Sequence, residues 1–416
     1  MKALQPYYFC LLSIFIATTK VYASADEYSI YIDADFSHNL ESSQAIERGI
    51  NTALKGINYQ VNNLTLSTKR MDHRGNTKRS KKHIQAYLDD KKAIAIFSGL
   101  HSPPLLANRD FINKNQVLVL DPWAAAGPIT RYPDPENWIF RLSIDDSKAG
   151  EVITSYAVDH KKAKHPCLIL ENTGWGDSNK KTILKALKKR GLKPSLIQRF
   201  GWGLKSGEAG SIIENCLASE ADSVFLVANV TEGFYITKAI SQISKNNRLP
   251  IYSHWGITGG KFQELMPLSE LKKIDLFFLQ TKFSFSQKNL SAMQQSILGN
   301  LKKDYAEYEN PEDIKSSAGI IHAYDLTLTL IEALKNAPTT NSIQTLRRST
   351  RNNLENLKNP IQGLIKEYRK PFRAFRPDDT DAHEALNISD YVMGFFDSKY
   401  NITLDSWAYN GNSSDK

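Results

Sequence analysis

Short apolar runs alternate along the chain with longer stretches in which apolar residues recur at helical spacing. Residues 94–102 and 117–130 each begin with a continuous apolar run and end in small residues and proline, and a predicted helix over 103–114 joins them. Such runs are typical of buried parallel strands, and amphipathic connections between them are typical of helices. The pattern predicts an α/β fold built on parallel sheets.

This rhythm occurs twice, separated by a proline-punctuated connection over 132–138. We therefore predict two doubly wound, Rossmann-like lobes. The predicted strands are 28–33, 59–68, 94–98, 117–121, 139–144, 166–171, 195–200, 223–228, 250–253, 275–281, 364–368 and 391–396, and the predicted helices are 43–54, 80–90, 103–114, 147–159, 178–190, 208–219, 231–244, 290–307, 316–336 and 343–353.

The carboxyl ends of the two central strands are the first candidate site. In an open parallel sheet, ligands bind beyond these ends, which here are residues 98–102 and 122–127. Small residues let a ligand approach backbone N–H groups, and the helix that begins at Ser102-Pro103 is expected to offer free amides to an anion. The same pattern also fits two ordinary strand-to-helix turns.

The length of 416 residues favours two domains over one core. The first 25 residues have Lys2, an apolar stretch over 7–18 and the small residues Ala23, Ser24 and Ala25, which predicts a secretory signal peptide cleaved after Ala23 or Ala25. The apolar stretch is too short to span a bilayer, and no later run reaches 18 apolar residues. We expect a free, soluble protein that is exported through the membrane.

Charge and motifs exclude several functions. Without Lys2 and Lys20, 51 basic residues face 44 acidic ones, a net charge of +7, and much of the excess lies in solvated runs. No nucleic-acid motif is present. The segment 256–261 is not a phosphate loop, because Phe262 stands where serine or threonine is needed.

No enzyme or cofactor site emerges. We find no nucleophile with a base partner, so we predict no catalytic activity; an exported hydrolase is the rival interpretation. Asp378, Asp379, Asp381 and His383 could gather a cation, but carboxylates in an exposed loop are usually solvated, and we predict no metal and no cofactor.

Cys167 and Cys216 remain after cleavage. Export permits a disulfide between them, but Cys167 lies in a predicted strand and Cys216 in a predicted helix, where either could be a small buried residue. Both possibilities stay open.

Three tryptophans, Trp123, Trp175 and Trp255, follow the carboxyl ends of predicted strands, and Trp202 lies in a loop. Tryptophan at a strand end can offer a flat surface and one N–H donor to a ligand. Each could equally be structural, but their equivalent positions in two lobes suggest a shared aromatic cleft.

Taken together, the chain resembles the type I periplasmic binding proteins, specifically the branched-chain amino-acid and amide-binding (leucine-binding-protein-like) family. The resemblance spans essentially the whole mature chain and depends on the order and spacing of several short motifs. These are Phe36-Ser-His, Ile96-Phe-Ser-Gly-Leu-His-Ser-Pro-Pro, Asp121-Pro-Trp-Ala-Ala-Ala, Ile139-Phe-Arg-Leu-Ser-Ile-Asp-Asp, Gly174-Trp-Gly-Asp-Ser and Ala323-Tyr-Asp-Leu.

The resemblance implies two α/β lobes joined by a three-strand hinge, with a ligand cleft between them. It implies a monomeric periplasmic solute-binding protein that closes on a small-molecule ligand and delivers it to the membrane permease of an ABC importer. The alternative is a ligand-sensing subunit for a membrane histidine kinase or diguanylate cyclase. The expected division is signal peptide 1–25, first lobe 26–141 plus 276–362, second lobe 142–275 plus 363–405, and tail 406–416.

By position, the resemblance implies that Ser102 matches the serine that holds a solute carboxylate and that Trp175 matches an aromatic residue that closes over the solute. Two departures matter: Ala125 stands where amino-acid binders have threonine, and Trp255 stands where they have the glutamate that meets the ammonium group. We therefore expect a solute with an aromatic, apolar or quaternary-cation part that stacks on the tryptophans, and not a simple α-amino acid. The candidate ligand-binding residues are Ser102, Trp123, Ala124, Ala125, Trp175, Trp255, His101 and Asn229.

Overall fold

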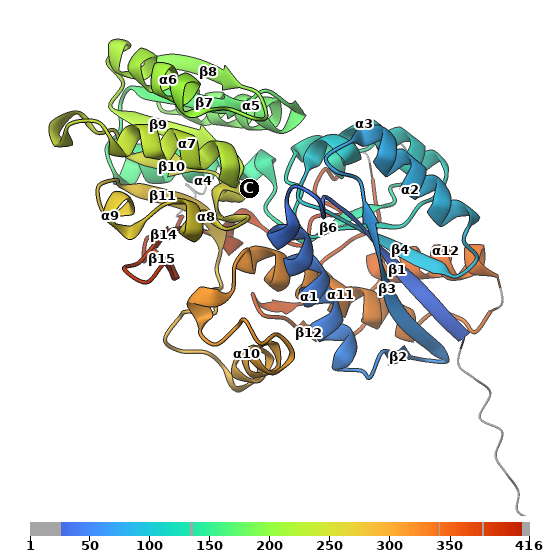
Figure 1. Cartoon of the computed structure of the whole chain (residues 1–416). Coiled ribbons are helices and arrows are strands. Elements are labelled where there is room, and N and C mark those ends of the chain that lie inside the picture. Colours follow the sequence, from blue (N-terminus) through green and yellow to red (C-terminus); the bar gives the residue numbers. More distant parts are fainter. Residues whose placement is uncertain (1–25, 134–135, 341, 377, 410–416) are drawn as a thin grey trace, which may run out of the picture.

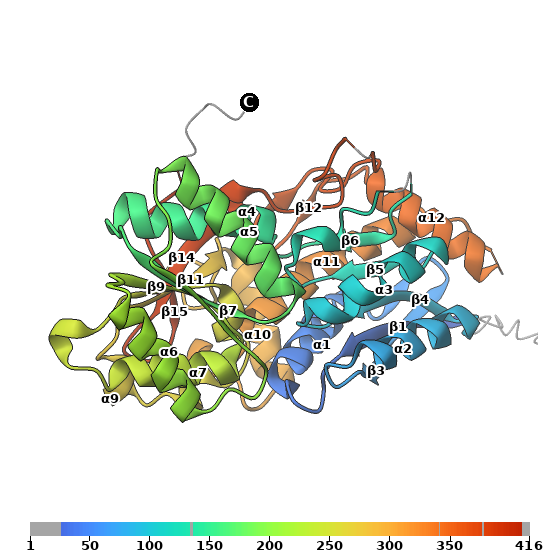
Figure 2. The same ribbon diagram turned by 90° about the horizontal axis from the view of Figure 1, so that it is seen from above.

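The structure is a computed structural model that describes residues 26–133, 136–340, 342–376 and 378–409. The predicted signal peptide, residues 1–25, lies outside the described residues. Two α/β lobes lie side by side, each built around one mostly parallel sheet with helices on its faces (Figures 1 and 2). The predicted fold class of two doubly wound lobes is confirmed. No helix in the described part of the chain is both long and apolar enough to cross a membrane.

The sheet of the first lobe has the order β2-β3-β1-β4-β5-β6, and every neighbouring pair except β2 and β3 is parallel. The chain moves outward on opposite sides of β1 and β4, so the switch point of this sheet lies between these two strands. Its strands are β1 (Asp26–Ala34), β2 (Gln60–Val61), β3 (Leu64–Asp72), β4 (Ala93–Ser98), β5 (Val119–Asp121) and β6 (Ile139–Arg141), and the helices on this side are α1 (Leu40–Lys55), α2 (Thr77–Asp89), α3 (Ser102–Lys114), α10 (Ala292–Asp304), α11 (Ser317–Lys335) and α12 (Ile343–Glu355).

The sheet of the second lobe has the order β15-β14-β11-β10-β9-β7-β8. Strands β14 and β15 are antiparallel additions at one edge, and the switch point lies between β7 and β9. Its strands are β7 (Pro166–Glu171), β8 (Leu196–Phe200), β9 (Ser223–Val227), β10 (Ile251–Ser253), β11 (Leu276–Thr281), β14 (Tyr391–Phe396) and β15 (Ile402–Leu404), and its helices are α4 (Asp146–Thr154), α5 (Gly174–Lys189), α6 (Ser206–Ala218), α7 (Val230–Ser241), α8 (Phe262–Leu265) and α9 (Leu268–Leu271).

The chain crosses between the lobes after β6, after β11 and before β14. Because β11 pairs with β10 and β14, residues 276–281 lie in the second sheet, whereas the expected division placed them in the first lobe. Leu364 and Phe372 pack in clusters of the first lobe, so the chain crosses back later than residue 363. The hairpin of β12 (Ile361–Gln362) and β13 (Glu367–Tyr368) lies on this side. The division into lobes that move separately stays a prediction.

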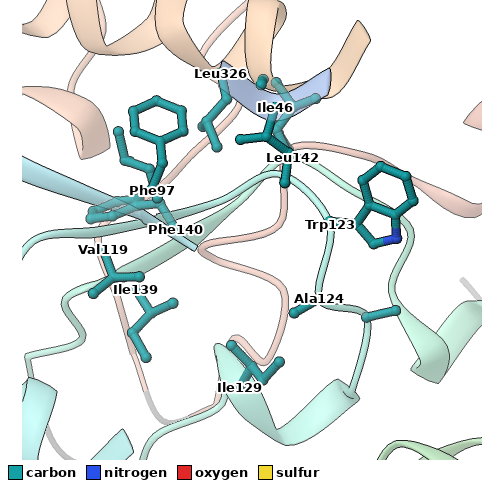
Figure 3. Close-up of a cluster of buried hydrophobic side chains, with 14 of the residues drawn as sticks. Ile46, Phe97, Val119, Trp123, Ala124, Ile129, Ile139, Phe140, Leu142 and Leu326 are labelled. Carbon is teal, nitrogen blue, oxygen red and sulfur yellow. The ribbon is translucent and has the colours of Figure 1, made fainter. Parts of the chain in front are cut away.

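The largest apolar core fills the first lobe and continues into the second. Figure 3 shows part of it, in which Ile46, Phe97 and Phe140 surround the strand ends and Trp123 stands at the edge. The same cluster includes Trp175 and Trp255 of the second lobe. The tryptophans therefore join the two lobes through buried apolar contacts.

Local structure differs from the sequence expectation at two places that matter for the site. Helix α5 begins at Gly174, so residues 174–177, which were expected in a loop, form its first turn. The helix can start there because a Cβ at Gly176 would collide with the Glu171 carbonyl, a contact that only glycine avoids. Cys167 and Cys216 form a disulfide that links β7 to α6, which resolves the open alternative.

A buried ion network lies where β6 leaves the first lobe. The Arg141 guanidinium, fully buried, donates to Glu384 and Asp145 and also to the carbonyls of Ala124 and Ala126. This network fixes the loop after β5, which carries the candidate residues Trp123, Ala124 and Ala125, to the crossing segments.

Candidate functional site

The carboxyl ends of five strands from both sheets face one another between the lobes. They enclose an inner chamber of about 10 Å³, which has room for about one water molecule. The strand ends are those of β4 and β5 from the first lobe and β7, β9 and β10 from the second, with β1 beside them. The residues lining the inner chamber are Leu100, His101, Ser102, Pro103, Trp123, Ala125, Glu171, Trp175, Asn229, Trp255 and Gly256.

Seven of the eight candidate residues line this chamber, and the exception is Ala124. The Ala124 side chain is buried in the apolar core behind the loop, and its carbonyl accepts a hydrogen bond from Arg141. Residues Ala125 and Ala124 are neighbours in the chain, but only the first faces the space between the lobes. The structure therefore brings together residues that lie as far apart in sequence as 101 and 255.

Trp123 and Trp255 are packed as core residues. The rings of Trp123 and Trp255 lie 5.2 Å apart at 38°, and each side chain is 1% exposed. A Cβ at Gly319 would lie 2.7 Å from Cζ3 of Trp123, and one at Gly259 would lie 2.9 Å from its Cζ2. The Trp123 ring is thus held between two positions that only glycine can occupy.

The ring of His322 lies beneath Trp255 at a centroid distance of 4.8 Å. One ring nitrogen is 3.0 Å from Oγ1 of Thr281 and the other is 3.2 Å from the Pro122 carbonyl oxygen. Burial lowers the pKa of His322 to about 3, against a weaker opposing effect of the carbonyl. This histidine is therefore neutral at pH 7, because burial disfavours the charged imidazolium.

The start of α3 offers fewer donors than expected. Helix α3 begins at Ser102, but the next two residues are Pro103 and Pro104, which have no N–H group. The amides of Trp123 and Ala124 already donate to Oδ1 of Asp121. The expected anion site of free helix amides is therefore weakened, because most of the local N–H donors are missing or engaged.

Ser102 keeps one useful group. Its Oγ accepts a hydrogen bond from the amide of Ala126 at 3.2 Å, which leaves its hydroxyl hydrogen for another acceptor. Below this loop, burial raises the pKa of Asp121 to about 7, despite the charge of Arg141 and the hydrogen bonds from Trp123 and Ser98.

Glu171 is a site residue that the sequence analysis did not single out. It ends β7, lines the inner chamber and is 1% exposed. Asn229 Nδ2 donates to its Oε2 at 3.1 Å, and Thr173 Oγ1 donates to its Oε1 at 2.9 Å. Burial raises the pKa of Glu171, and hydrogen bonds from Trp202 and Thr173 oppose this rise. The sequence did hold a signal for Glu171, because it is an acidic residue at the end of an apolar strand, on the edge of the sheet where ligands bind.

A second, larger space, the outer chamber, opens beside the inner one and has a volume of about 340 Å³. His101 and Asn229 line both chambers, so the two spaces adjoin. Both lobes contribute to its walls. The residues lining the outer chamber are Asp35, His38, Asn39, Arg74, Gly75, His101, Trp202, Gly203, Asn229, Thr231 and Glu232.

Asp35 follows β1 and supplies a buried negative charge to the outer chamber. Its oxygens accept hydrogen bonds from the His38 amide at 2.9 Å and from Asn39 Nδ2 at 2.9 Å, and His101 Nε2 lies 3.3 Å away. Burial alone would raise the pKa of Asp35, but the hydrogen bonds from His101, the His38 amide and Asn39 outweigh burial and hold the pKa well below its usual range. The carboxylate is therefore ionised.

Trp202 reaches from the second lobe to the first across the outer chamber. It lies between Gly201 and Gly203, and it is 48% exposed. Its ring is 5.2 Å from the ring of His101, and a Cβ at Gly75 would lie 3.2 Å from its Cζ3. Gly75 has φ +68°, so the close approach and the backbone conformation both require glycine there.

The acidic loop near residue 380 does not lie at either chamber. Asp378 pairs with Arg376, Asp379 with Arg373, and Asp381 with Arg131 and Lys148. His383 is buried, with its ring nitrogens next to Glu355 and the Ile139 carbonyl. Among the residues that the structure describes, no group of acidic, histidine and cysteine side chains is arranged to hold a metal ion.

We compared the chain with protein-family models, with curated protein sequences and with solved structures. The model of the periplasmic binding protein family matches residues 37–385. No curated protein sequence matches the chain. Many solved structures have the same fold, at low sequence identity.

One similar structure is a periplasmic binding protein type 1 from Bordetella pertussis Tohama I, with 17% identity and a TM-score of 0.72 over 91% of this chain and 100% of that one. Another is the branched-chain amino acid transporter substrate binding protein LivJ from Streptococcus pneumoniae in complex with isoleucine, with 16% identity and a TM-score of 0.73 over 91% and 100% of the two chains. A third is a solute binding protein of an ABC transporter from R. palustris in complex with 4-hydroxybenzoate, with 15% identity and a TM-score of 0.73 over 92% and 97%. The chain belongs to the periplasmic binding protein family, whose members bind solutes and are not enzymes.

Proposed function

We propose that the protein is exported to the periplasm, captures a small organic solute between its lobes and delivers it to an ABC importer. The observation that carries this proposal is the meeting of strand ends from both switch points around the two adjoining chambers. A solute held there touches both lobes, so binding favours the closed arrangement over an open one.

Contacts between the lobes support capture by closure. The amide of Gly127 in the first lobe donates to Oγ of Ser178 in the second at 3.0 Å, and Lys261 pairs with Glu41 across the lobes at 3.2 Å. These two polar contacts are partly exposed, so they stabilise closure only weakly. The closed arrangement also has the buried packing of Trp123 against Trp255, and a solute that touches both lobes adds to it.

The polar groups favour some solutes over others. Glu171 and Asp35 bring carboxyl groups to the chambers, whereas Pro103 and Pro104 remove amides that an anion would use. LivJ from Streptococcus pneumoniae is in complex with isoleucine and the R. palustris protein with 4-hydroxybenzoate, both carrying a carboxylate. We propose that this chain takes a cationic or hydrogen-bond-donating solute instead.

A thermal-shift screen of the mature protein against a metabolite library tests solute capture. A ligand at hundredfold excess over its dissociation constant should add about 2.7 kcal/mol of stability. Deleting the gene should then abolish uptake of that solute by the host. A library without any stabilising compound would contradict solute capture, and unchanged uptake after deletion would contradict delivery to an importer.

A further inference from the structure

We propose that the solute is a flat-ring cation bound in the outer chamber, between the ring of Trp202 and the carboxylate of Glu232, above inner tryptophans that it does not displace. This inference rests on the proposed function and specifies where the solute lies and which chemical class it belongs to.

Space favours the outer chamber. The inner chamber holds about one water molecule, and the outer chamber, at about 340 Å³, falls within the range of small-molecule sites. To enlarge the inner chamber, Trp123 would have to leave the slot between Gly319 and Gly259, and its contact with Trp255 would be lost. That costs buried aromatic contact area, whereas the outer chamber requires no such loss.

Glu232 is the group with an open position. It is 7% exposed and lies in the first turn of α7, where one of its oxygens accepts a hydrogen bond from the amide of Gly203 at 2.9 Å. Among the described residues, no hydrogen bond reaches its other oxygen. A cationic group or an N–H donor of a solute in the outer chamber can pair with this second oxygen of the Glu232 carboxylate.

The charges around Glu232 favour a cation. Glu171 lies close enough for the two carboxyl groups to repel each other, and Asp35 adds an ionised carboxylate on the opposite lobe. Arg74 is the one arginine or lysine in the lining, and its Nε pairs with Asp72 at 3.2 Å. The imidazoles of His38 and His101 both face Asp35. The lining therefore has more negative than positive fixed charge.

Trp202 supplies the flat surface. Its ring packs against His101 and beside the backbone of Gly75, and its indole lies close enough to Glu171 to oppose the rise of that carboxyl's pKa. Trp202 is nearly half exposed and is one of the residues that line the outer chamber. An exposed indole beside carboxylates is suited to a cation that also stacks.

The test is isothermal titration of the full mature protein with tryptamine and benzyltrimethylammonium as cations, tryptophol as the neutral counterpart and indole-3-acetate as the anion. At least one cation should bind, and the neutral and anionic probes should bind at least about tenfold more weakly. Trp202→Ala and Glu232→Gln should each weaken cation binding by about tenfold or more, whereas Trp202→Phe should retain most of it.

Two controls separate the outer chamber from general effects. Glu214→Gln, on exposed α6, makes the same charge change outside the chamber and should leave binding unchanged. Trp175→Phe alters the inner chamber and should change cation binding by less than about threefold.

The outcomes are distinct. Tighter binding of indole-3-acetate, or cation binding that survives both Trp202→Ala and Glu232→Gln, would overturn the proposal. A library compound that stabilises the protein while neither cation binds would also overturn it and would leave solute capture intact. If no compound of any charge binds, the proposed function itself fails.

Discussion

The inner and outer chambers adjoin between the lobes, yet the side chains in them are used differently. In the inner chamber, Trp123 packs against Trp255 at a tilt, and Gly319 and Gly259 close around the Trp123 ring. In the outer chamber, Trp202 is half open and faces carboxylates. Aromatic residues at a ligand-binding edge can therefore belong to the core or to the site, and their packing partners decide which.

The largest effect on the free energy of unfolding should come from removing the indole of a tryptophan in the inner chamber. Trp123→Ala should lower the free energy of unfolding by about 3–5 kcal/mol, because it leaves a cavity in a dry core. Trp202→Ala should lower it by less than about 1 kcal/mol, because that ring is already half exposed. Urea unfolding of both variants measures the difference. Equal losses would show that the two regions are packed alike.

The next largest difference between the two chambers should be in how the free energy of unfolding depends on pH. The folded pKa of His322 is about 3, below its unfolded value near 6.5, so the neutral form stabilises the fold and this stability is lost as pH falls through that window. Relative to His322→Asn, the wild type should lose about 1.4 kcal/mol per pH unit between pH 6 and pH 4.

Asp35, in the outer chamber, should show no such dependence in that range. Its folded pKa is depressed, so its contribution is lost only as pH falls below the unfolded value near 3.9. Denaturant unfolding of the wild type and the variant at each pH measures the His322 effect. Parallel pH curves would contradict a neutral, buried His322.

Replacing glycine by alanine should change the free energy of unfolding by a smaller amount, with opposite signs beside the inner chamber and away from it. Gly319→Ala should cost about 1–3 kcal/mol, because its Cβ would press on Trp123. Gly210→Ala, inside α6 with open space around it, should instead stabilise the fold by about 0.5–1 kcal/mol through helix propensity. Thermal melts of both variants measure the signs. A neutral Gly319→Ala would show that the indole can shift and that the inner chamber is adaptable.

The smallest effect on the free energy of unfolding should come from the partly exposed ion pair between the lobes. Lys261→Ala removes a partly exposed ion pair with Glu41 across the lobes and should change the free energy of unfolding by less than about 0.5 kcal/mol. Urea unfolding at low and high salt measures it. A loss of several kcal/mol would mean that direct contacts between the lobes, and not the solute, hold the closed form.

Strand and helix periodicity was enough to predict the two lobes and to bring seven candidate residues to one chamber. This worked because carboxyl ends of parallel strands share an edge, whatever their distance in sequence. The periodicity failed where geometry depended on backbone contact: the predicted helix began only at residue 178, but Gly176 lets α5 begin at Gly174 against the Glu171 carbonyl.

The outer chamber could not be predicted in the same way. Its walls come from loops after β1, β3 and β8 and from the first turn of α7, and loop conformation is not fixed by periodicity. The tight seating of Trp123 depends on Gly319, far away in α11, which no local pattern links to it. The acids Asp35 and Glu171 stand at strand ends and could have been found by asking which charged residues share the ligand-binding edge.

A crystal structure of the protein with a bound cation tests the central claim most directly. The account predicts a ligand whose ring stacks on Trp202 and whose cationic group meets Glu232, with Trp123 and Trp255 still in contact. A ligand seated between Trp123 and Trp255 would contradict it.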